Sequence, residues 1–337
     1  MSHKIAINGF GRIGRMVFRI MEQLEDFEVV AINDLTDPSM LAHLLEFDSV
    51  HRRYAADIQV QEGALLVDGR RIPTTAQRDP SKLDWRAHGV DVVLECTGIF
   101  RTGQDAKVHL DAGARKVIIS APAKGVDTTV VVGVNDGDLD PEKHAIVSNG
   151  SCTTNCLAPV VKVVDDAFGV ESGLMTTIHS YTNDQRLLDL PHKDKRRARA
   201  AALSMIPTST GAALAVGEVL PHLKGKLDGI SVRVPTPNVS LTDVVLLTKV
   251  DVTAEGVNAA FEAAAANGPL KGILGYETRP LVSTDYIGDP RSSIVDAENT
   301  AVIGNRMLKV LSWYDNEWGF SNRMVDLSRL VLGLPRL

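Results

Sequence analysis

The feature that most constrains the fold is a glycine-rich segment near the start of the chain, Gly9-Phe10-Gly11-Arg12-Ile13-Gly14. It follows an apolar run at 4–8 and precedes an amphipathic stretch at 13–24, which predicts a strand, a tight turn and a helix. In such a unit the first glycine permits the turn, the second lets the backbone approach a pyrophosphate, and the third allows close packing of helix on strand. The pyrophosphate would lie at the positive end of the helix.

An acidic residue follows at the distance that this kind of site requires. A second strand is expected at 28–33, and Asp34 ends it, 20 residues after Gly14. A carboxylate there can bind the hydroxyls of an adenosine ribose and repel a 2′-phosphate. The sequence therefore predicts a dinucleotide site that prefers NAD over NADP, with Arg12 as a further candidate beside the pyrophosphate.

The first half of the chain continues the same alternation of strands and helices. Apolar runs at 91–96, 116–120, 129–132 and 145–148 lack a polar-apolar alternation, which is typical of strands buried on both faces of a parallel sheet. We therefore expect a Rossmann-type, doubly wound α/β domain over residues 1–151.

The pattern changes after about residue 150. Long segments at 230–234, 240–250 and 307–313 alternate apolar with polar residues, which predicts an antiparallel sheet with one face less deeply buried. A second domain of α+β type is expected over 152–316. The polar and basic stretch 181–202 is too long for an ordinary connection, so we expect it to be functional or packed at an interface.

Charge and hydropathy exclude several classes of function. Lys and Arg number 36 against 42 Asp and Glu, so the net charge of −6 gives no general attraction to nucleic acid or anionic membranes. The basic cluster at 193–199 has no accompanying nucleic-acid-binding signature. No apolar run approaches the roughly 18 residues that span a bilayer, and the chain starts without a signal peptide. We expect a soluble, cytoplasmic protein.

The three cysteines differ in their settings. Cys96, Cys152 and Cys156 cannot form a disulfide framework, and a lone C-x-x-x-C makes a poor zinc site, so no metal is expected. Cys96 lies in an apolar strand, and Cys156 lies one helical turn beyond Cys152. Both are expected to be buried and inert.

Cys152 is the candidate nucleophile. It follows the strand at 145–148 and opens a helix, where the helix dipole and free backbone N–H groups favour a thiolate. His179 ends a strand-like run at 174–178 and is the candidate base, and an imidazolium there would lower the pKa of the thiol further. The other histidines, His109 among them, lack such a setting. A thiol, a histidine and a dinucleotide site predict covalent catalysis with hydride transfer.

Five separated motifs, in order along the chain, resemble the phosphorylating, NAD-dependent glyceraldehyde-3-phosphate dehydrogenases of bacterial type. The resemblance covers essentially the whole chain, and its motifs lie at 5–15, 151–159, 192–194, 196–201 and 313–319. It implies a catalytic domain over 152–316, a C-terminal segment 317–337 that packs back on the NAD-binding domain, and a homotetramer.

The resemblance also implies a reaction. Cys152 would attack the aldehyde of glyceraldehyde 3-phosphate, with His179 taking the thiol proton and assisting hydride departure to NAD. Inorganic phosphate would then release the resulting thioester as 1,3-bisphosphoglycerate, a step of glycolysis, and the backbone N–H of Cys152 would help to hold the oxyanion.

The implied binding residues form three groups. Thr182 and Arg233 would bind the substrate's own phosphate, and the attacking phosphate would be held by Ser151, Thr153, Arg197, Thr210 and Gly211. Hydroxyls, backbone N–H groups and guanidinium groups suit both anions. The cofactor would contact Gly9, Gly11, Arg12, Ile13, Gly14, Asp34, Arg78, Ser120 and Asn316. Erythrose-4-phosphate dehydrogenase, which shares most of these motifs and does not need phosphate as acyl acceptor, is the alternative.

Overall fold

A computed structural model describes residues 2–337. The chain forms two compact units. Unit 1 comprises the residues up to Val130 together with Asp136–Gly150 and Ser321–Leu337, and unit 2 comprises Val131–Asn135 and Ser151–Phe320. Within residues 2–337 no helix has the length and apolarity needed to cross a membrane.

Unit 1 is built around a nine-stranded sheet with the order β3-β4-β5-β2-β1-β6-β7-β9-β8. Its strands are β1 (His3–Asn8), β2 (Phe27–Asn33), β3 (Ile58–Gln61), β4 (Ala64–Val67), β5 (Arg70–Thr75), β6 (Val92–Glu95), β7 (Lys116–Ile119), β8 (Thr128–Thr129) and β9 (Ile146–Ser148). Its helices are α1 (Arg12–Met21), α2 (Pro38–Glu46), α3 (Gly103–Asp111) and the greater part of α7 (Trp318–Val331).

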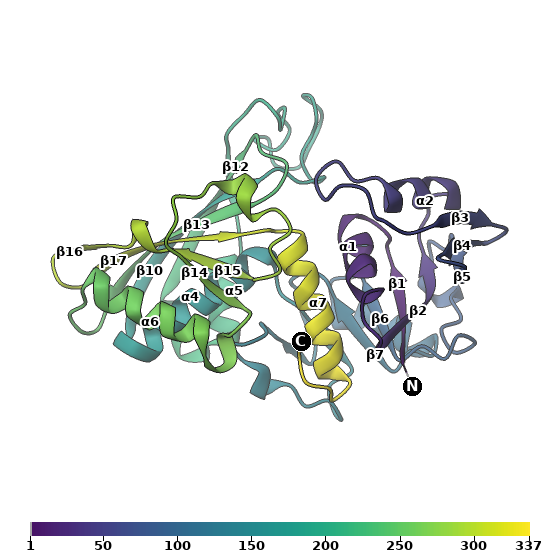
Figure 1. The fold of residues 1–337 in the computed structure, drawn as a ribbon, viewed down its shortest axis with the longest axis horizontal. Coiled ribbons are helices and arrows are strands. Elements are labelled where there is room, and N and C mark those ends of the chain that lie inside the picture. Colours follow the sequence, from purple (N-terminus) through teal and green to yellow (C-terminus); the bar gives the residue numbers. More distant parts are fainter. Residues whose placement is uncertain (1) are drawn as a thin grey trace. The chain divides into compact units, whose positions relative to one another are not determined.

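The centre of this sheet is parallel and buried on both faces. The pairs β1·β2, β1·β6, β6·β7 and β7·β9 are all parallel. Ile5, Ile7 and the apolar residues of β6 and β7 are at most 1% exposed, as continuous apolar runs predict for such strands. The labels of Figure 1 show β1, β2, β6 and β7 side by side with α1 beside them.

One expected strand of unit 1 is largely absent. The run 129–132 was predicted as a strand, but β8 covers only Thr128–Thr129. Val131–Asn135 belong to unit 2, where the backbone N–H of Val131 donates to Asn135 Oδ1 at 2.8 Å. Gly133 has a φ of +86°, and a Cβ there would come within 2.8 Å of the Pro269 carbonyl oxygen. The valines 130–132 are buried beside a turn that the glycine permits. An apolar run shows that residues are buried, but it does not show whether they form a strand or a turn.

Unit 2 contains an eight-stranded sheet with the order β11-β12-β10-β13-β17-β15-β14, and β16 pairs with β17. The strands are β10 (Val170–Ser180), β11 (Ile206–Ser209), β12 (Leu227–Val234), β13 (Ser240–Thr248), β14 (Leu274–Glu277), β15 (Ser293–Asp296), β16 (Ala301–Ile303) and β17 (Met307–Tyr314). The helices are α4 (Cys152–Phe168), α5 (Ala212–Val219) and α6 (Ala254–Ala266).

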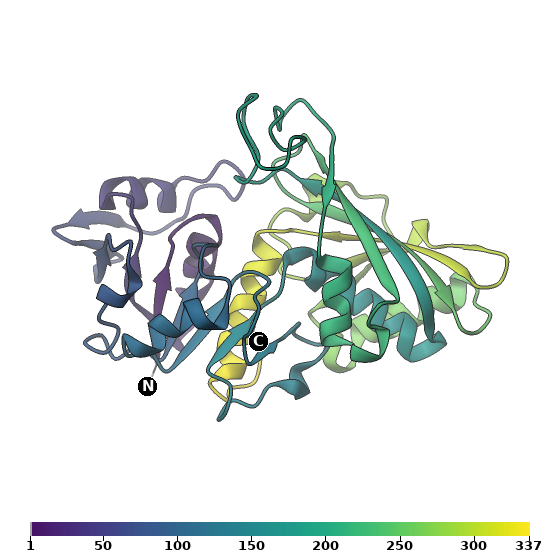
Figure 2. The ribbon, with the colours of Figure 1, turned by 180° about the vertical axis from the view of Figure 1, so that it is seen from behind.

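This sheet is mainly antiparallel, with parallel pairs only at β10·β12 and β14·β15 among residues 2–337. Along β13, Ser240, Thr242, Val244 and Leu246 are buried while the residues between them are half-buried. The expected fold class, a doubly wound parallel sheet plus a mainly antiparallel α+β unit, is therefore confirmed. Between β10 and β11 the chain forms the long loop 181–205, which extends beyond the strands of unit 2 (teal in Figures 1 and 2).

Candidate active site

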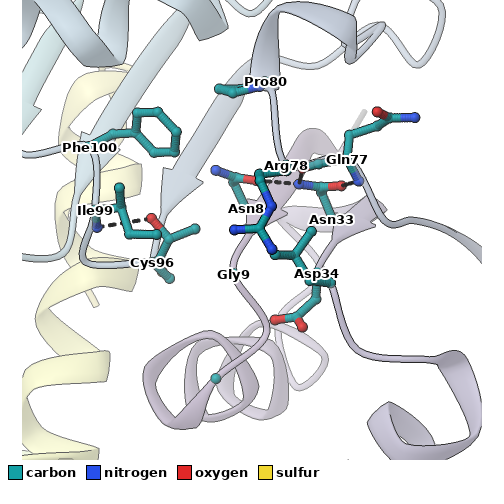
Figure 3. A pocket seen from close by; sticks show the side chains of 13 residues that line it. Asn8, Gly9, Asn33, Asp34, Gln77, Arg78, Pro80, Cys96, Ile99 and Phe100 are labelled. Carbon is teal, nitrogen blue, oxygen red and sulfur yellow. Dashed lines mark hydrogen bonds between the residues drawn. The ribbon is translucent and has the colours of Figure 1, made fainter. Parts of the chain in front are cut away.

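A pocket of about 400 Å³ lies at the carboxyl ends of the central strands of unit 1. This is the edge at which open α/β sheets bind their ligands. The side chains in Figure 3 converge on it from β1, β2, β6 and the loops that follow. It is lined by Asn8, Gly9, Gly11, Asn33, Asp34, Leu35, Gln77, Arg78, Pro80, Cys96, Thr97, Ile99 and Phe100.

The three glycines of the turn each meet a different constraint. Gly9 has a φ of +94°, and a Cβ there would come within 2.6 Å of the backbone nitrogen of Thr97. A Cβ on Gly14 would come within 2.3 Å of the Gly9 carbonyl oxygen, whereas a Cβ on Gly11 would meet nothing within 4 Å. Gly9 and Gly14 are thus required by packing, and Gly11 keeps the open side of the turn clear for a ligand.

Asp34 lines the pocket and also holds the glycine turn. Its Oδ2 accepts a hydrogen bond from the backbone N–H of Phe10 at 2.7 Å, and its Oδ1 accepts one from the backbone N–H of Thr36 at 2.9 Å. Arg15 Nη1 donates to the Phe10 carbonyl oxygen at 2.9 Å. Side chains therefore hold both the backbone N–H and the backbone carbonyl of Phe10, and the sequence pattern did not predict these two contacts.

The other predicted cofactor residues lie in different positions around the turn. Arg78 lines the pocket, and Ile13 lies in the first turn of α1. The Arg12 guanidinium pairs with Asp48, with Nη1–Oδ2 and Nη2–Oδ1 distances of 2.9 and 3.3 Å. Ser120 follows β7 and donates its backbone N–H to the Glu95 carbonyl oxygen, but it does not line this pocket. The residues present fit a dinucleotide, because an open glycine turn, a strand-end carboxylate and a cation surround one cavity.

A thiol and an imidazole meet in unit 2. Cys152 is the first residue of α4, and the Ser151 hydroxyl caps this helix by accepting the backbone N–H of Thr154 at 3.0 Å. His179 lies near the end of β10, and its Nε2 is 3.5 Å from Cys152 Sγ. His179 Nδ1 is 2.7 Å from the Ser180 carbonyl oxygen, which only accepts, and 3.3 Å from Arg233 Nη1, which only donates. The shorter contact assigns the ring proton to Nδ1, so the Nε2 lone pair faces the thiol.

Strand register places a cation beside this pair. His179 and Arg233 are partners in the parallel pairing of β10 with β12. Arg233 Nη1 donates to the Ser180 carbonyl oxygen and to Thr182 Oγ1, both at 3.2 Å. Its Nε is buried and has no hydrogen-bond partner among residues 2–337, which leaves one donor of the guanidinium unused.

Burial and the Arg233 charge set the protonation of the pair. Burial, followed by the Arg233 charge, lowers the pKa of His179 to about 3, so the imidazole is neutral near pH 7. Burial raises the pKa of the Cys152 thiol, and Arg233 and Thr153 oppose that rise. The expected assistance from an imidazolium is therefore not present, and the neutral ring instead has the form of a base.

Tyr314 packs against the His179 ring and contacts Thr153, the neighbour of Cys152. Its hydroxyl lies 2.9 Å from both Thr153 Oγ1 and Thr177 Oγ1, and its ring packs edge-on against the His179 ring with centroids 6.0 Å apart. Tyr314 belongs to the motif at 313–319, but its role cannot be seen in the sequence. Only its place at the end of β17, next to β13, shows what it contacts.

Asn316, the predicted nicotinamide contact, is held by two serines. Its Oδ1 lies 2.8 Å from the hydroxyls of both Ser180 and Ser240, which donate to it. This fixes the amide and leaves its NH₂ group directed away from the two serines. Neither serine was singled out from the sequence.

The predicted phosphate residues of unit 2 form two groups. Thr182 lies with Arg233, as described above. Arg197 pairs with Asp184 and donates to Thr208 Oγ1 at 3.0 Å and to the Ser209 carbonyl oxygen at 3.3 Å, next to Thr210 and Gly211. Gly211 is the N-cap of α5, and Thr210 Oγ1 accepts the backbone N–H of Ala212 at 3.2 Å. The ion pair between Asp184 and the Arg197 guanidinium was not predicted from the sequence.

A glycine turn with a strand-end carboxylate, on a sheet of this type, marks the chain as an NAD-binding protein, and the family models below give its class as an NAD-dependent dehydrogenase. Residues 3–103 match the model described as "Glyceraldehyde 3-phosphate dehydrogenase, NAD binding domain", and residues 151–316 match "Glyceraldehyde 3-phosphate dehydrogenase, C-terminal domain".

Curated relatives extend the similarity over nearly the full length. The chain is 59% identical over 331 residues to "Glyceraldehyde-3-phosphate dehydrogenase 1" of Bacillus subtilis (strain 168) and to "Glyceraldehyde-3-phosphate dehydrogenase" of Geobacillus stearothermophilus, covering 98% of each chain in both cases. It is 53% identical over 332 residues to the enzyme of that name from Streptomyces coelicolor, covering 98% of this chain and 99% of the relative. The chain belongs to the glyceraldehyde-3-phosphate dehydrogenase family.

Proposed function

We propose that this protein oxidises D-glyceraldehyde 3-phosphate in the presence of inorganic phosphate to 1,3-bisphosphoglycerate, the glycolytic reaction. The observation that carries the proposal is the Cys152–His179 pair with Arg233 beside it. A thiol that faces a neutral imidazole at 3.5 Å can be deprotonated as it attacks a carbonyl. Bound NAD supplies the hydride acceptor.

Cys152 and His179 carry the covalent steps. Cys152 Sγ bonds to the aldehyde carbon while His179 Nε2 takes the thiol proton and passes it to the carbonyl oxygen. The product is a thiohemiacetal on the enzyme, and the imidazole is neutral again. Loss of the carbon-bound hydrogen as hydride, with loss of the hydroxyl proton to His179, leaves a thioester on Cys152. A phosphate oxygen then attacks the thioester carbon, and the C–S bond breaks to return Cys152 as a thiolate.

Backbone and side-chain donors stabilise the negative charges of this sequence. The backbone N–H of Cys152, at the start of α4, is proposed to hold the oxyanion. The Arg233 guanidinium, with Thr182, is proposed to bind the substrate's phosphate, and its unused Nε–H supports this assignment.

A second group of donors is proposed to hold the attacking phosphate. It comprises Ser151, Thr153, Arg197, Thr210 and Gly211. The guanidinium of Arg197 is oriented by Thr208 and Asp184, so it is positioned before the anion arrives. Asn316, fixed by its two serines, is proposed to bind the carboxamide of the cofactor.

The assembly is proposed to be a homotetramer in the cytoplasm. Leu174, Ile230 and Met307 of the unit 2 sheet are 68%, 50% and 49% exposed, and an apolar surface of this kind marks an interface. Leucines of the loop 181–205 are also exposed. Light scattering on the purified protein should give about four times the 36.4 kDa of one chain. A monomer at micromolar concentration would contradict the tetramer.

The reaction is tested by steady-state NADH formation on two aldehydes. We expect glyceraldehyde 3-phosphate to be used with a kcat/KM at least about tenfold above that of erythrose 4-phosphate. Arsenate should replace phosphate as acceptor, because it has the same geometry and charge. A preference for the tetrose, with no response to either anion, would favour erythrose-4-phosphate dehydrogenase instead.

A further inference from the structure

A buried carboxylate lies behind the dinucleotide pocket of unit 1 and has no role in the chemistry above. Glu95 ends β6 and is 0% exposed. Its Oε2 accepts from Asn8 Nδ2 at 2.6 Å and lies 3.0 Å from His109 Nε2. Its Oε1 accepts from the backbone N–H of Thr97 at 2.9 Å and from the Thr97 hydroxyl. Four donors thus surround this one carboxylate, which satisfies both of its oxygens.

The tautomer of His109 follows from its other neighbour. Trp85 Nε1, which can only donate, lies 3.1 Å from His109 Nδ1. Nδ1 therefore accepts, so the ring proton lies on Nε2 and is donated to Glu95. Both the histidine and the glutamate are fully buried, and His109 does not line the pocket.

The hydrogen bonds continue from Glu95 across the ends of β1, β2 and β5. Asn8 Oδ1 accepts from Asn33 Nδ2 at 2.7 Å. Asn33 Oδ1 in turn accepts from Thr75 Oγ1 and from the backbone N–H of Gln77, both at 2.8 Å. Figure 3 shows Asn8, Asn33 and Gln77 together at one side of the pocket. Four of the residues that line the pocket, Asn8, Asn33, Gln77 and Thr97, are therefore joined to Glu95 directly or through one another.

Two groups set the direction of these hydrogen bonds. Glu95 accepts from Asn8 Nδ2, and the Gln77 backbone holds Asn33 by donating its N–H to Oδ1 at 2.8 Å and accepting from Nδ2 at 2.9 Å. Because donors surround both of its oxygens, Glu95 acts here only as an acceptor, so Asn8 must turn its NH₂ group toward Glu95 and its oxygen toward Asn33. Asn33 must then donate to Asn8 and present its own oxygen to Thr75 and Gln77. From this geometry we propose that Glu95 is a positioning residue that fixes the polar wall of the dinucleotide pocket and thereby sets the affinity for NAD. The proposal rests on the assignment of this pocket to NAD.

Replacing Glu95 with its neutral isostere, glutamine, would disturb the orientation of these hydrogen bonds. Glu95→Gln puts an NH₂ group beside either the Thr97 donors or the donors of Asn8 and His109, so two donors face each other in each orientation. His109 cannot relieve this by moving its proton, because Trp85 still requires an acceptor at Nδ1. The Asn8 amide would then lose its single orientation, although the Gln77 backbone still holds Asn33. Ordering the pocket around a ligand would therefore cost more free energy.

The experiment compares Glu95→Gln with a matched buried carboxylate in unit 2. Glu277 is 8% exposed, ends β14 and is held by Arg279, so Glu277→Gln controls for loss of a buried carboxylate in general. NAD affinity is measured by calorimetry on the full-length protein, and kcat at saturating NAD. We expect the Kd for NAD to rise about tenfold in Glu95→Gln, with kcat within about threefold of wild type. Glu277→Gln should leave the Kd within about twofold.

A second pair of variants keeps the test valid if Glu95→Gln does not fold. His109→Gln retains an N–H donor for Glu95, whereas His109→Phe removes it. His109→Phe should raise the Kd several-fold more than His109→Gln, although neither side chain lines the pocket. Unchanged NAD affinity in Glu95→Gln, or equal effects of the two His109 variants, would overturn the proposal. Absence of NAD binding by the wild-type protein would overturn the assignment of the pocket instead.

Discussion

His179 and Arg233 are register partners in the parallel pairing of β10 with β12, and Arg233 Nη1 lies 3.3 Å from His179 Nδ1. Strand pairing thus places a permanent cation beside the imidazole that faces Cys152. Together with burial, this cation lowers the pKa of His179 to about 3. The neutral imidazole can accept the thiol proton, and the nearby guanidinium stabilises the thiolate that remains.

The lowered pKa of His179 predicts a pH-dependent stability. The unfolded chain binds a proton at this histidine with a pKa near 6.5, and the folded protein only below about pH 3. Between these values the unfolded state holds more protons, so the free energy of unfolding rises with pH by at most about 1.4 kcal/mol per pH unit. Urea unfolding of wild type and His179→Asn is measured at pH 4 to 7. The free energy of unfolding should rise more steeply with pH in wild type than in His179→Asn. Parallel pH profiles would contradict it.

The three cysteines should differ widely in reactivity. Burial raises the pKa of Cys156 to about 11 and that of Cys96 to about 12, which leaves few thiolates near neutral pH. Cys96 was expected to be buried, but it is half-buried like Cys152 and lines the dinucleotide pocket. Only Cys152 faces a base, so iodoacetamide should label it at least about a hundredfold faster. Peptide mapping after brief labelling measures this. Cys152→Ser should lower kcat by a factor on the order of 10³ or more, and full activity after alkylation of Cys152 would exclude the thiol mechanism.

Asp34 should control both cofactor choice and the glycine turn. Asp34→Gly removes the repulsion of a 2′-phosphate and also the acceptor for the Phe10 N–H. The ratio of kcat/KM for NAD to that for NADP should fall by about ten- to a hundredfold, mainly through a loss with NAD. Initial rates with both cofactors measure this ratio. Equal use of the two cofactors by the wild-type enzyme would show that Asp34 does not select NAD.

Arg233 and Arg197 should give different kinetic signatures because they are assigned to different anions. Arg233→Ala should raise the KM for the phosphorylated aldehyde by about ten- to a hundredfold and affect the response to inorganic phosphate less. Arg197→Ala should raise the KM for inorganic phosphate and affect the KM for the aldehyde less. Each variant is assayed by varying one substrate at a time. The same general loss in both variants would argue against two separate anion sites.

Parts of the fold followed directly from the sequence. The strands of the parallel sheet are continuous apolar runs, and β13 and β17 alternate, so their burial patterns are visible in the residues themselves. The strands β3, β4 and β5 were not predicted. β3 is largely exposed, and β5 carries two arginines and a proline, so neither shows a clear apolar pattern. β4 is a short apolar run like β6 and β7, and it was overlooked. Short exposed strands carry little periodicity.

The candidate site was predicted only in part. Cys152 was placed because a helix start is a local feature, and His179 because it ends a strand. The partners Tyr314, Ser180 and Ser240 come from strands far apart in sequence, so their contacts depend on sheet order. Glu95 and His109 were missed for the same reason, since an acidic residue at the end of an apolar strand shows no partner until α3 is placed.

Release of the acyl group from Cys152 by phosphate can be measured in a rapid-mixing experiment. Enzyme is mixed with NAD and glyceraldehyde 3-phosphate without phosphate, and NADH is followed by absorbance. We predict a burst of about one NADH per active site followed by a rate at most a few per cent of the full rate, because the thioester persists. Addition of phosphate should restore continuous turnover. A linear rate without phosphate, unchanged when phosphate is added, would show that the acyl group does not wait on Cys152 for phosphate.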